Sequence, residues 1–417
     1  MVAFYSSRNQ GRLRQVRIAF VFDDTLDVLD GVQHHIITLG REVARRGHHV
    51  EYLVGQTEHS PVPDAHSLAR NMMVSFNGNR MRIPISANRA DIRRVLRDGN
   101  YDVLDVQAPY SPLLSGKVLA AAAPSVGVVA TYHIAPTGRL AYSGGKLLGA
   151  INRRSHRRVD EVVAVSPVAA VYARGTAHVS STVIANPVDV DRLVRSREAA
   201  GAERIAQFHG NGPHVVFVGR FVARKGAGIL LDALRWGEQH DAFPAGMHVT
   251  LAGKGPLLAR CQAQAATLRT PVEFTGFITE ADKPALLASA DVAVFPSTGG
   301  ESFGIVLLEA IAAGSRVVLA GDNPGYRSTL LDDDDALFPV GRANRANRSG
   351  NADHMGPDTG RDAALARRIT RALADEPWAE AIHARQSALL GRYDVKTVAN
   401  QVEAVYMKAI ADRRRGG

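Results

Sequence analysis

The most informative stretch of the sequence is GGESFGIVLLEA, residues 299–310. The apolar run before it, residues 291–295, predicts a buried strand. Residues 303–313 predict a helix with Ser302 as its N-cap. A second apolar run at residues 316–320 predicts the next strand. The order is therefore strand, glycine-rich loop, helix, strand, which is the repeating unit of parallel α/β sheets.

The start of this helix is suited to bind a phosphate group. The first backbone N–H groups of a helix have no intrahelical partner, and the helix dipole adds positive potential there. Glu301 and Glu309 stand eight residues apart, and eight steps of about 100° bring the second within roughly 80° of the first. Both carboxylates are therefore expected to line one cleft. The alternative is that Glu301 only complements the helix dipole and Glu309 is a solvated helix residue.

Composition indicates a globular protein with a sizeable core. The chain has 417 residues, which favours two or three domains, and 46% of them are hydrophobic and 22% charged. Its one cysteine, Cys261, has no internal disulfide partner, and no Cys/His cluster has zinc spacing. The first sixteen residues lack the apolar core of a signal peptide, and no run approaches about 18 apolar residues. We therefore expect a cytoplasmic protein without a transmembrane helix.

Positive charge is concentrated in the first half of the chain. The net charge is +9, of which residues 1–190 carry +7 and residues 191–417 carry +2. Such a half favours nucleic acid, anionic lipid or a phosphorylated ligand as partner, and no nucleic-acid motif is present. Basic helices are predicted over residues 90–97 and 146–159. Their arginines form either a solvated face or a peripheral face for an anionic membrane, such as the inner face of the plasma membrane.

Strands and helices alternate along both halves, which predicts α/β domains with doubly wound parallel sheets. In the first half, a strand at residues 16–22 is followed by a helix that begins near Gly31. His133 directly follows the strand at residues 125–132, and ligands bind at the carboxyl ends of strands in open α/β sheets.

A pair of basic residues stands in the second half of the chain. Arg220 and Lys225 flank the turn between the strand at residues 215–218 and the next helix. An arginine offers a fork of donors and a lysine a mobile point charge, so the pair suits a diphosphate. The alternative is a solvated basic loop.

These strings resemble those of the retaining glycosyltransferases of family 4, in which two Rossmann-like domains face each other across a cleft (the GT-B fold). The similarity is strongest to bacterial phosphatidylinositol mannosyltransferases. The matching strings are the two glutamates of residues 300–309, Asp27-Val28…Gly31-Val32-Gln33, Phe76-Asn77-Gly78, Tyr101-Asp102-Val103-Leu104 and Thr131-Tyr132-His133. The resemblance implies an acceptor-binding domain at residues 1–190 and a nucleotide-sugar-binding domain at residues 191–394. It also implies a last helix, residues 395–417, that crosses back to the first domain.

The resemblance also implies the roles of single residues. His133 and Glu301 would be catalytic, with Glu301 holding hydroxyls of the donor sugar and His133 orienting it. The donor nucleotide would be bound by Gly31, Arg220, Lys225, Gly253, Phe277, Ile278, Phe303, Gly304, Ile305 and Glu309. The acceptor would be bound by Gln33, Asn77 and Tyr132. The family has a glycine where this chain has Asp30, which puts a carboxylate beside the expected diphosphate.

The expected reaction is transfer of a hexose, such as mannose, from a GDP- or UDP-linked donor to a sugar or glycolipid acceptor, phosphatidylinositol being one candidate. No cofactor and no metal are expected, because Asp189-Val190-Asp191, which spells the D-x-D metal motif, stands in a polar linker. Three alternatives remain open at this point. They are a sugar-nucleotide epimerase of the same architecture, a transferase acting on a soluble acceptor, and a protein that binds nucleic acid without catalysis.

Overall fold

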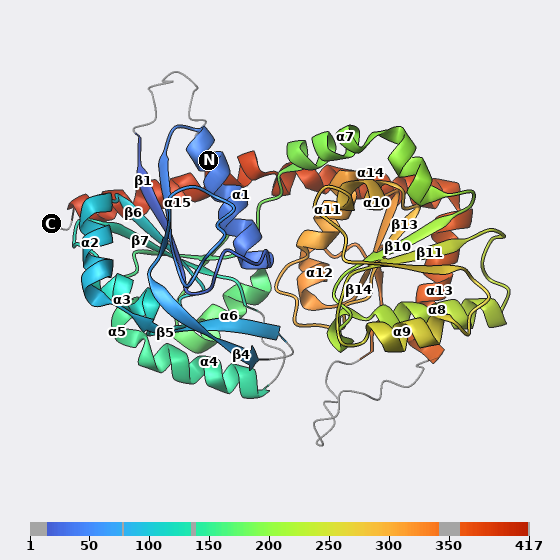
Figure 1. Ribbon diagram of the computed structural model, residues 1–417, viewed down its shortest axis with the longest axis horizontal. Coiled ribbons are helices and arrows are strands. Elements are labelled where there is room, and N and C mark those ends of the chain that lie inside the picture. The colour runs from blue at the N-terminus through green and yellow to red at the C-terminus, as the bar shows by residue number, and fades with distance from the viewer. Residues whose placement is uncertain (1–14, 77–78, 135–138, 342–358, 416–417) are drawn as a thin grey trace, which may run out of the picture.

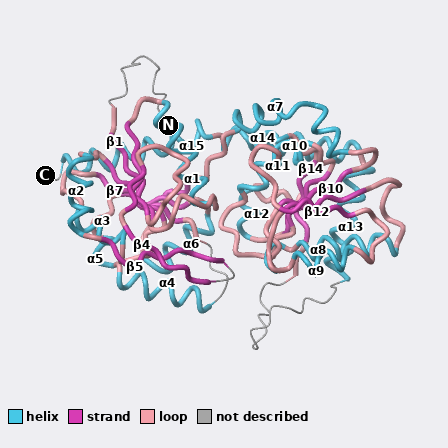
Figure 2. Tube along the Cα trace, viewed as in Figure 1, coloured by secondary structure: helices cyan, strands magenta, loops and turns pink. Residues whose placement is uncertain are grey.

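Two parallel sheets form the centres of two domains. The computed structural model of the chain describes residues 15–76, 79–134, 139–341 and 359–415. Figure 1 shows the two sheets side by side, and Figure 2 shows that helices surround each of them. The strand order is β3-β2-β1-β6-β7-β8-β9 in the first sheet and β12-β11-β10-β13-β14-β15 in the second. All pairings within these two sheets are parallel, so the predicted doubly wound architecture is confirmed.

The strand bounds follow the apolar runs of the sequence. The first sheet contains β1 (Arg17–Phe22), β2 (His49–Val54), β3 (Ala65–Ser67), β6 (Val103–Gln107), β7 (Gly127–Tyr132), β8 (Glu161–Ala164) and β9 (Thr182–Val183). The second contains β10 (His214–Val218), β11 (His248–Ala252), β12 (Val272–Gly276), β13 (Val292–Phe295), β14 (Val317–Gly321) and β15 (Leu337–Phe338). An antiparallel hairpin, β4 (Ala69–Phe76) with β5 (Asn79–Ala87), lies outside both sheets.

Both faces of each sheet are covered by helices, and the central strands consist mostly of apolar residues. Side chains of a strand alternate between its two faces. In β1, Ile18 and Phe20 enter one core cluster while Ala19 and Val21 enter another. In β10, Phe217 and Val216 likewise enter different clusters. The central strands are therefore buried on both sides.

The helices of the first domain are α1 (Gly31–Arg45), α2 (Arg89–Gly99), α3 (Leu114–Ala121), α4 (Arg139–Ile151), α5 (Arg153–His156) and α6 (Pro167–Ala177). The remaining helices are α7 (Val190–His209), the short 3₁₀ helix η1 (Ala223–Lys225), α8 (Ala227–Gln239), α9 (Leu258–Ala265), α10 (Lys283–Ala288), α11 (Ile305–Ala313), α12 (Pro324–Thr329), α13 (Thr359–Ala374), α14 (Glu376–Tyr393) and α15 (Val395–Arg415). No helix of the described residues is both long and apolar enough to span a membrane.

The last helix, α15, leaves the second sheet and packs against the first (Figure 1). The Tyr406 hydroxyl donates a 2.6 Å hydrogen bond to Asp105 of β6. Burial raises the pKa of Asp105 to about 6, although hydrogen bonds from Tyr406 and Thr131 lower it. The chain passes between the sheets at two adjacent points, because Val188 accepts from Val395 N and donates to Tyr393 O, both at 2.9 Å.

Two predicted segments in the first half of the chain differ from the structure. The basic helix predicted over residues 146–159 is two helices, and Arg158 lies beyond both. Its guanidinium donates to the carbonyls of Ala123 and Val126, so this arginine fastens a loop and is only 17% exposed at its side chain. The predicted polar linker at Asp189 is the start of α7, where the Asp189 carboxylate caps the helix by accepting from Arg192 N.

Candidate active site

A cleft of about 640 Å³ lies between the two sheets, at the carboxyl ends of strands from both. The first domain lines it with the β1–α1 loop, with His133 after β7 and with Asn186 after β9. The second domain lines it with the loops that follow β10, β11, β12 and β13. Ligands of open α/β sheets bind at this edge, so the sequence-predicted donor residues meet here.

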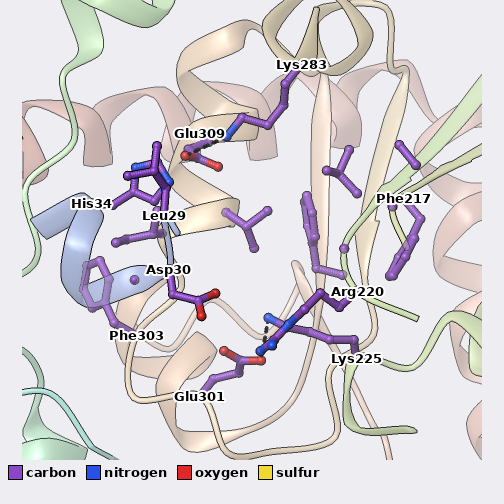
Figure 3. Close-up of a pocket in the computed structure, with 18 of the residues that line it drawn as sticks. Leu29, Asp30, His34, Phe217, Arg220, Lys225, Lys283, Glu301, Phe303 and Glu309 are labelled. Carbon is purple, nitrogen blue, oxygen red and sulfur yellow. Dashed lines mark hydrogen bonds and ion pairs between the residues drawn. The ribbon is translucent and has the colours of Figure 1, made fainter. Parts of the chain in front are cut away.

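Glu301 is held in this cleft by two cations and a hydroxyl, and Figure 3 shows it beside one of the cations, Lys225. Its Oε1 lies 2.6 Å from Arg224 Nη1 and 2.8 Å from Lys225 Nζ. Ser297 Oγ donates to the same oxygen at 2.9 Å. Within the described residues the hydrogen bonds of this carboxylate all end on Oε1, so Oε2 remains available to accept a bond from a ligand in the cleft.

The two cations keep this buried carboxylate ionised. Burial alone would raise the pKa of Glu301, but the charges of Lys225 and Arg224 hold it below its ordinary value. An ionised carboxylate only accepts hydrogen bonds, so Oε2 is an acceptor for hydroxyl or amine donors. Sequence inspection assigned no role to Arg224. Its partner stands 77 residues away in the chain, and no local pattern reveals such a pair.

A glycine with positive φ fixes Lys225. Gly226 has φ of 74°, and a Cβ added there would lie 2.1 Å from the Pro296 carbonyl oxygen. Only glycine tolerates this conformation and this approach, so the turn brings Lys225 against the loop that carries Glu301. Arg220 lines the same part of the cleft. Gly253, at φ of 143°, is equally constrained, because its Cβ would meet the Gly219 carbonyl oxygen at 1.9 Å.

Glu309 forms a second charged group at the other end of the cleft. Its Oε1 lies 3.1 Å from Lys283 Nζ, which also contacts Glu280 Oε1 at 3.0 Å. Burial lowers the pKa of Lys283, but the neighbouring Glu309 and Glu280 raise it above its ordinary value. His34 of α1 lies near Glu309 in Figure 3. The sequence analysis did not identify Lys283 as a site residue. The one feature that could have indicated it is its place at the start of α10, five residues after the expected donor-binding residue Ile278.

His133 is buried and neutral. Its Nε2 lies 2.7 Å from Gln107 Oε1, so the geometry assigns the proton to Nε2 and leaves Nδ1 as an acceptor. Burial and the neighbouring His35 ring hold the pKa of His133 well below its ordinary value. The two rings meet edge to face with their centroids 4.8 Å apart. His35 is in turn fixed by a 2.9 Å contact between its Nδ1 and Asn186 Oδ1.

The helix after Glu301 begins later than predicted. Its first residue is Ile305 and its N-cap is Gly304, so Ser302 is not the cap. The cause is a tertiary contact, because the Gly304 N–H donates to Thr329 Oγ1 of α12 and Gly304 itself has a non-helical backbone. Ile305 and Val306 line the cleft, so the first turn of α11, with its unpaired N–H groups, faces the ligand space.

The structure places most of the expected donor residues around the cleft. Of the residues expected to be catalytic or to bind the donor, those that line the cleft are Gly31, His133, Arg220, Lys225, Gly253, Phe277, Ile278, Glu301, Phe303, Ile305 and Glu309. Gly304 is absent from the lining.

The expected acceptor residues are not brought together in the same way. Gln33 is buried and donates to the Thr25 carbonyl, and Tyr132 is buried against Tyr110. Neither lines the cleft. Asn77 lies outside the described residues. The acceptor roles of these residues remain predictions.

The described residues contain no group of three or more His, Cys, Asp or Glu side chains able to hold a metal ion. The D-x-D pair is used otherwise. Asp189 caps α7, and Asp191 lies 2.7 Å from Lys396 of α15.

Sequence comparison extends over nearly the whole chain. The profile of Glycosyltransferase Family 4 matches residues 29–192, and the profile of Glycosyl transferases group 1 matches residues 212–348. The chain is 32% identical to a phosphatidyl-myo-inositol mannosyltransferase of Mycobacterium tuberculosis over 397 residues, covering 94% of this chain and 96% of that protein. It is 31% identical to the protein of the same name in Mycolicibacterium smegmatis, with coverage of 94% and 93%.

Solved structures share the fold. A glycosyltransferase from Rickettsia africae superposes with a TM-score of 0.68 at 16% identity, covering 95% of this chain and 99% of that one. The Anabaena protein HepE in complex with UDP-glucose superposes with a TM-score of 0.63 at 18% identity, covering 93% and 98%. The chain therefore belongs to glycosyltransferase family 4, together with its phosphatidyl-myo-inositol mannosyltransferase relatives, and is a glycosyltransferase of the GT-B fold.

Proposed function

We propose that this glycosyltransferase moves mannose from GDP-mannose to phosphatidyl-myo-inositol, with retention at the anomeric carbon and without a metal ion. The choice of mannose and of the lipid acceptor is supported by the 32% identity, over 94% of this chain, to a protein named as a phosphatidyl-myo-inositol mannosyltransferase. One relative that matches over a shorter stretch, 39% identical over 25% of this chain and 26% of its own length, is named as GDP-mannose-dependent. The chemistry rests on one observation, the ionised Glu301 carboxylate, which contacts Lys225 through Oε1 and has no partner at Oε2 among the described residues.

The step that the enzyme must accelerate is the departure of the nucleoside diphosphate from the sugar. Negative charge grows on the leaving phosphate, and positive groups already in place stabilise it best. Arg220, Lys225 and the first turn of α11 would supply that charge in this cleft. The Lys225 ammonium would be shared between the donor phosphate and Glu301, because it already contacts Glu301 Oε1. It would thereby link the phosphate end of the donor to the carboxylate.

The two glutamates would hold opposite ends of the donor. Oε2 of Glu301 would accept a hydrogen bond from a sugar hydroxyl, because this oxygen has no partner among the described residues. Glu309 would accept bonds from the ribose hydroxyls while Lys283 keeps its carboxylate oriented. Ionised acceptors make stronger hydrogen bonds than neutral ones and so fix the sugar with few contacts.

His133 would orient the sugar as a neutral imidazole. Positive charge develops on the sugar ring when the glycosidic bond to phosphate breaks. A cationic histidine would repel that charge, and the lowered pKa of His133 avoids this. Closure of the two domains about the paired crossings at Val188 would then exclude water from the reacting atoms.

The donor is tested by ligand protection. A ligand that binds only the native state raises the unfolding midpoint. We expect GDP-mannose to raise it more than UDP-glucose or GDP-glucose at equal concentration, and equally in excess EDTA. Stronger protection by a UDP-sugar would overturn the choice of base, and loss of protection in EDTA that magnesium restores would overturn the metal-independent site.

An anionic lipid acceptor implies a membrane face, and the first domain offers one. On α4 the side chains of Leu147, Leu148 and Ile151 are exposed, and Arg153 and Arg154 of α5 are exposed next to them in the chain. An exposed apolar row with adjacent positive charge suits the surface of an anionic bilayer. The arginines of α2 are exposed as well, but among the apolar residues of that helix Ile92 is buried and Val95 and Leu96 are half-buried against the core.

We predict binding to liposomes that contain phosphatidylinositol and none to neutral phosphatidylcholine liposomes. Each basic residue near such a surface contributes about 1 kcal/mol. Reversing Arg153, Arg154 and Arg157 to Glu should therefore weaken co-sedimentation about 100-fold or more, and reversing Arg93, Arg94 and Arg97 should weaken it less. Arg269→Glu in the second domain is the control. Failure to bind either liposome at low salt would exclude a membrane face and favour a soluble acceptor.

A further inference from the structure

The loop between β1 and α1 carries four aspartates, and three of them hold the loop together. Asp23 accepts hydrogen bonds from Ser115 N at 2.8 Å and Ser115 Oγ at 2.5 Å. Asp24 accepts from Thr25 N at 2.7 Å. Asp27 accepts from the backbone N–H groups of Glu58 and His59 at 2.9 and 2.7 Å. These three carboxylates therefore have structural tasks.

The fourth, Asp30, is directed into the cleft. It lines the cleft, and Figure 3 shows its carboxylate pointing into the space bounded by Arg220 and Glu301. Asp30 stands at the N-cap of α1, yet its side chain makes no capping hydrogen bond. Among the described residues this carboxylate has neither a hydrogen bond nor an ion pair, in contrast to the other three of the loop.

Its position decides which ligand group can lie beside α1. The N-terminal end of a 15-residue helix favours anions through its dipole and its unpaired N–H groups. A carboxylate at the same end opposes this and repels a phosphate. There is room for a side chain here, because a Cβ on Gly31 would meet no atom within 4 Å. The loop is therefore open to ligand and negatively charged.

A carboxylate in such a place accepts hydrogen bonds from hydroxyl groups. We propose that Asp30 is a specificity-determining residue, which binds hydroxyls of the neutral polyol ring of the acceptor and keeps phosphate groups away from the start of α1. The diphosphate of the donor is then held from the second domain alone, by Arg220, Lys225 and α11. The acceptor half of this inference rests on the proposed function, whereas the phosphate half does not.

The test compares Asp30→Asn and Asp30→Gly with the wild type. Asp98→Asn on α2 is the matched control, since it removes the same charge at a side chain that is 61% exposed and not part of the cleft lining. The probe is GDP, titrated calorimetrically at low and physiological salt. Both Asp30 variants should bind GDP about 3- to 10-fold more tightly at low salt, with a smaller gain at high salt, because one like charge has gone. The control should bind as the wild type does.

The second readout is transfer to phosphatidyl-myo-inositol in detergent micelles. Asp30→Gly should raise the KM for this acceptor about 10-fold or more with a smaller change in kcat, and Asp30→Asn should raise it less, because its amide oxygen still accepts. An unchanged unfolding midpoint separates these effects from a loss of folding. GDP binding that is unchanged or weaker in both variants overturns the assignment whatever the acceptor proves to be. Tighter GDP binding with an unchanged acceptor KM overturns the hydroxyl-binding role.

If the wild type transfers nothing to phosphatidyl-myo-inositol, the proposed acceptor is wrong. The GDP titrations still decide whether Asp30 repels phosphate, so the two failures are distinguishable.

Discussion

Replacing Glu301 with glutamine is expected to lower kcat/KM for sugar transfer at least about 100-fold. The variant keeps the shape of the side chain but loses its charge. A hydrogen bond to a charged group is worth about 1.5–3 kcal/mol, which is roughly 10- to 150-fold in rate. The loss here should be near or above the upper end of that range. Glu301 is also the common partner of Arg224 and Lys225, and both cations would face a neutral amide in a buried site.

Steady-state kinetics with varied donor and a fixed acceptor measure this effect, and Glu273→Gln provides a control at an exposed position of the same domain. The unfolding midpoint and the affinity for GDP should be recorded alongside, because Glu301 is expected to act on the sugar more than on the nucleotide. Turnover within a factor of three of the wild type would show that the free oxygen of Glu301 does not hold the reacting sugar.

Removing either cation of the proposed diphosphate site should weaken donor binding. In Lys225→Ala the carboxylate keeps Arg224 and Ser297 as partners, so the fold of the loop survives. The donor loses one charge-assisted contact to phosphate, worth about 1.5–3 kcal/mol, so the Kd for GDP-mannose should rise roughly 10- to 150-fold. Arg220→Ala should have an effect of similar size. The double variant is not expected to show the sum, since both side chains would contact one diphosphate.

Titration of GDP-mannose and of mannose-free GDP into each variant measures these losses separately for the phosphates and for the sugar. Arg269→Ala, whose side chain is 72% exposed in the same domain, is the control. If both single variants bind GDP as tightly as the wild type, the diphosphate lies elsewhere.

The fold could be predicted from the sequence because strands are marked by local patterns of apolar residues. Strands β1 and β10 form at the predicted apolar runs, since a strand buried on both faces is a short and largely continuous run of apolar residues. Helix starts and ends were less accurate. The start of α11 depends on the Thr329 hydroxyl, 25 residues from Gly304, and the end of α4 could not be read from the arginine-rich residues 153–158 that follow it.

The site was predictable in its composition but not in its contacts. Glu301, Lys225 and Arg220 stand in strings that identify them, and all three line the cleft. The ion pair between Lys283 and Glu309 joins residues 26 apart and follows only from how α10 packs on α11. Gln33 and Tyr132 belong to matching strings, yet their side chains turn into the core, because local pattern does not fix which face of an element meets the cleft.

The central claim is retaining transfer of mannose to phosphatidyl-myo-inositol. Incubation of the purified protein with GDP-mannose and phosphatidyl-myo-inositol micelles, in excess EDTA, followed by NMR of the isolated glycolipid, tests it most directly. The account predicts a mannosylated lipid whose anomeric configuration is that of the donor, formed only when both substrates are present. A product of inverted configuration, or an altered nucleotide sugar that forms without any acceptor, would contradict it.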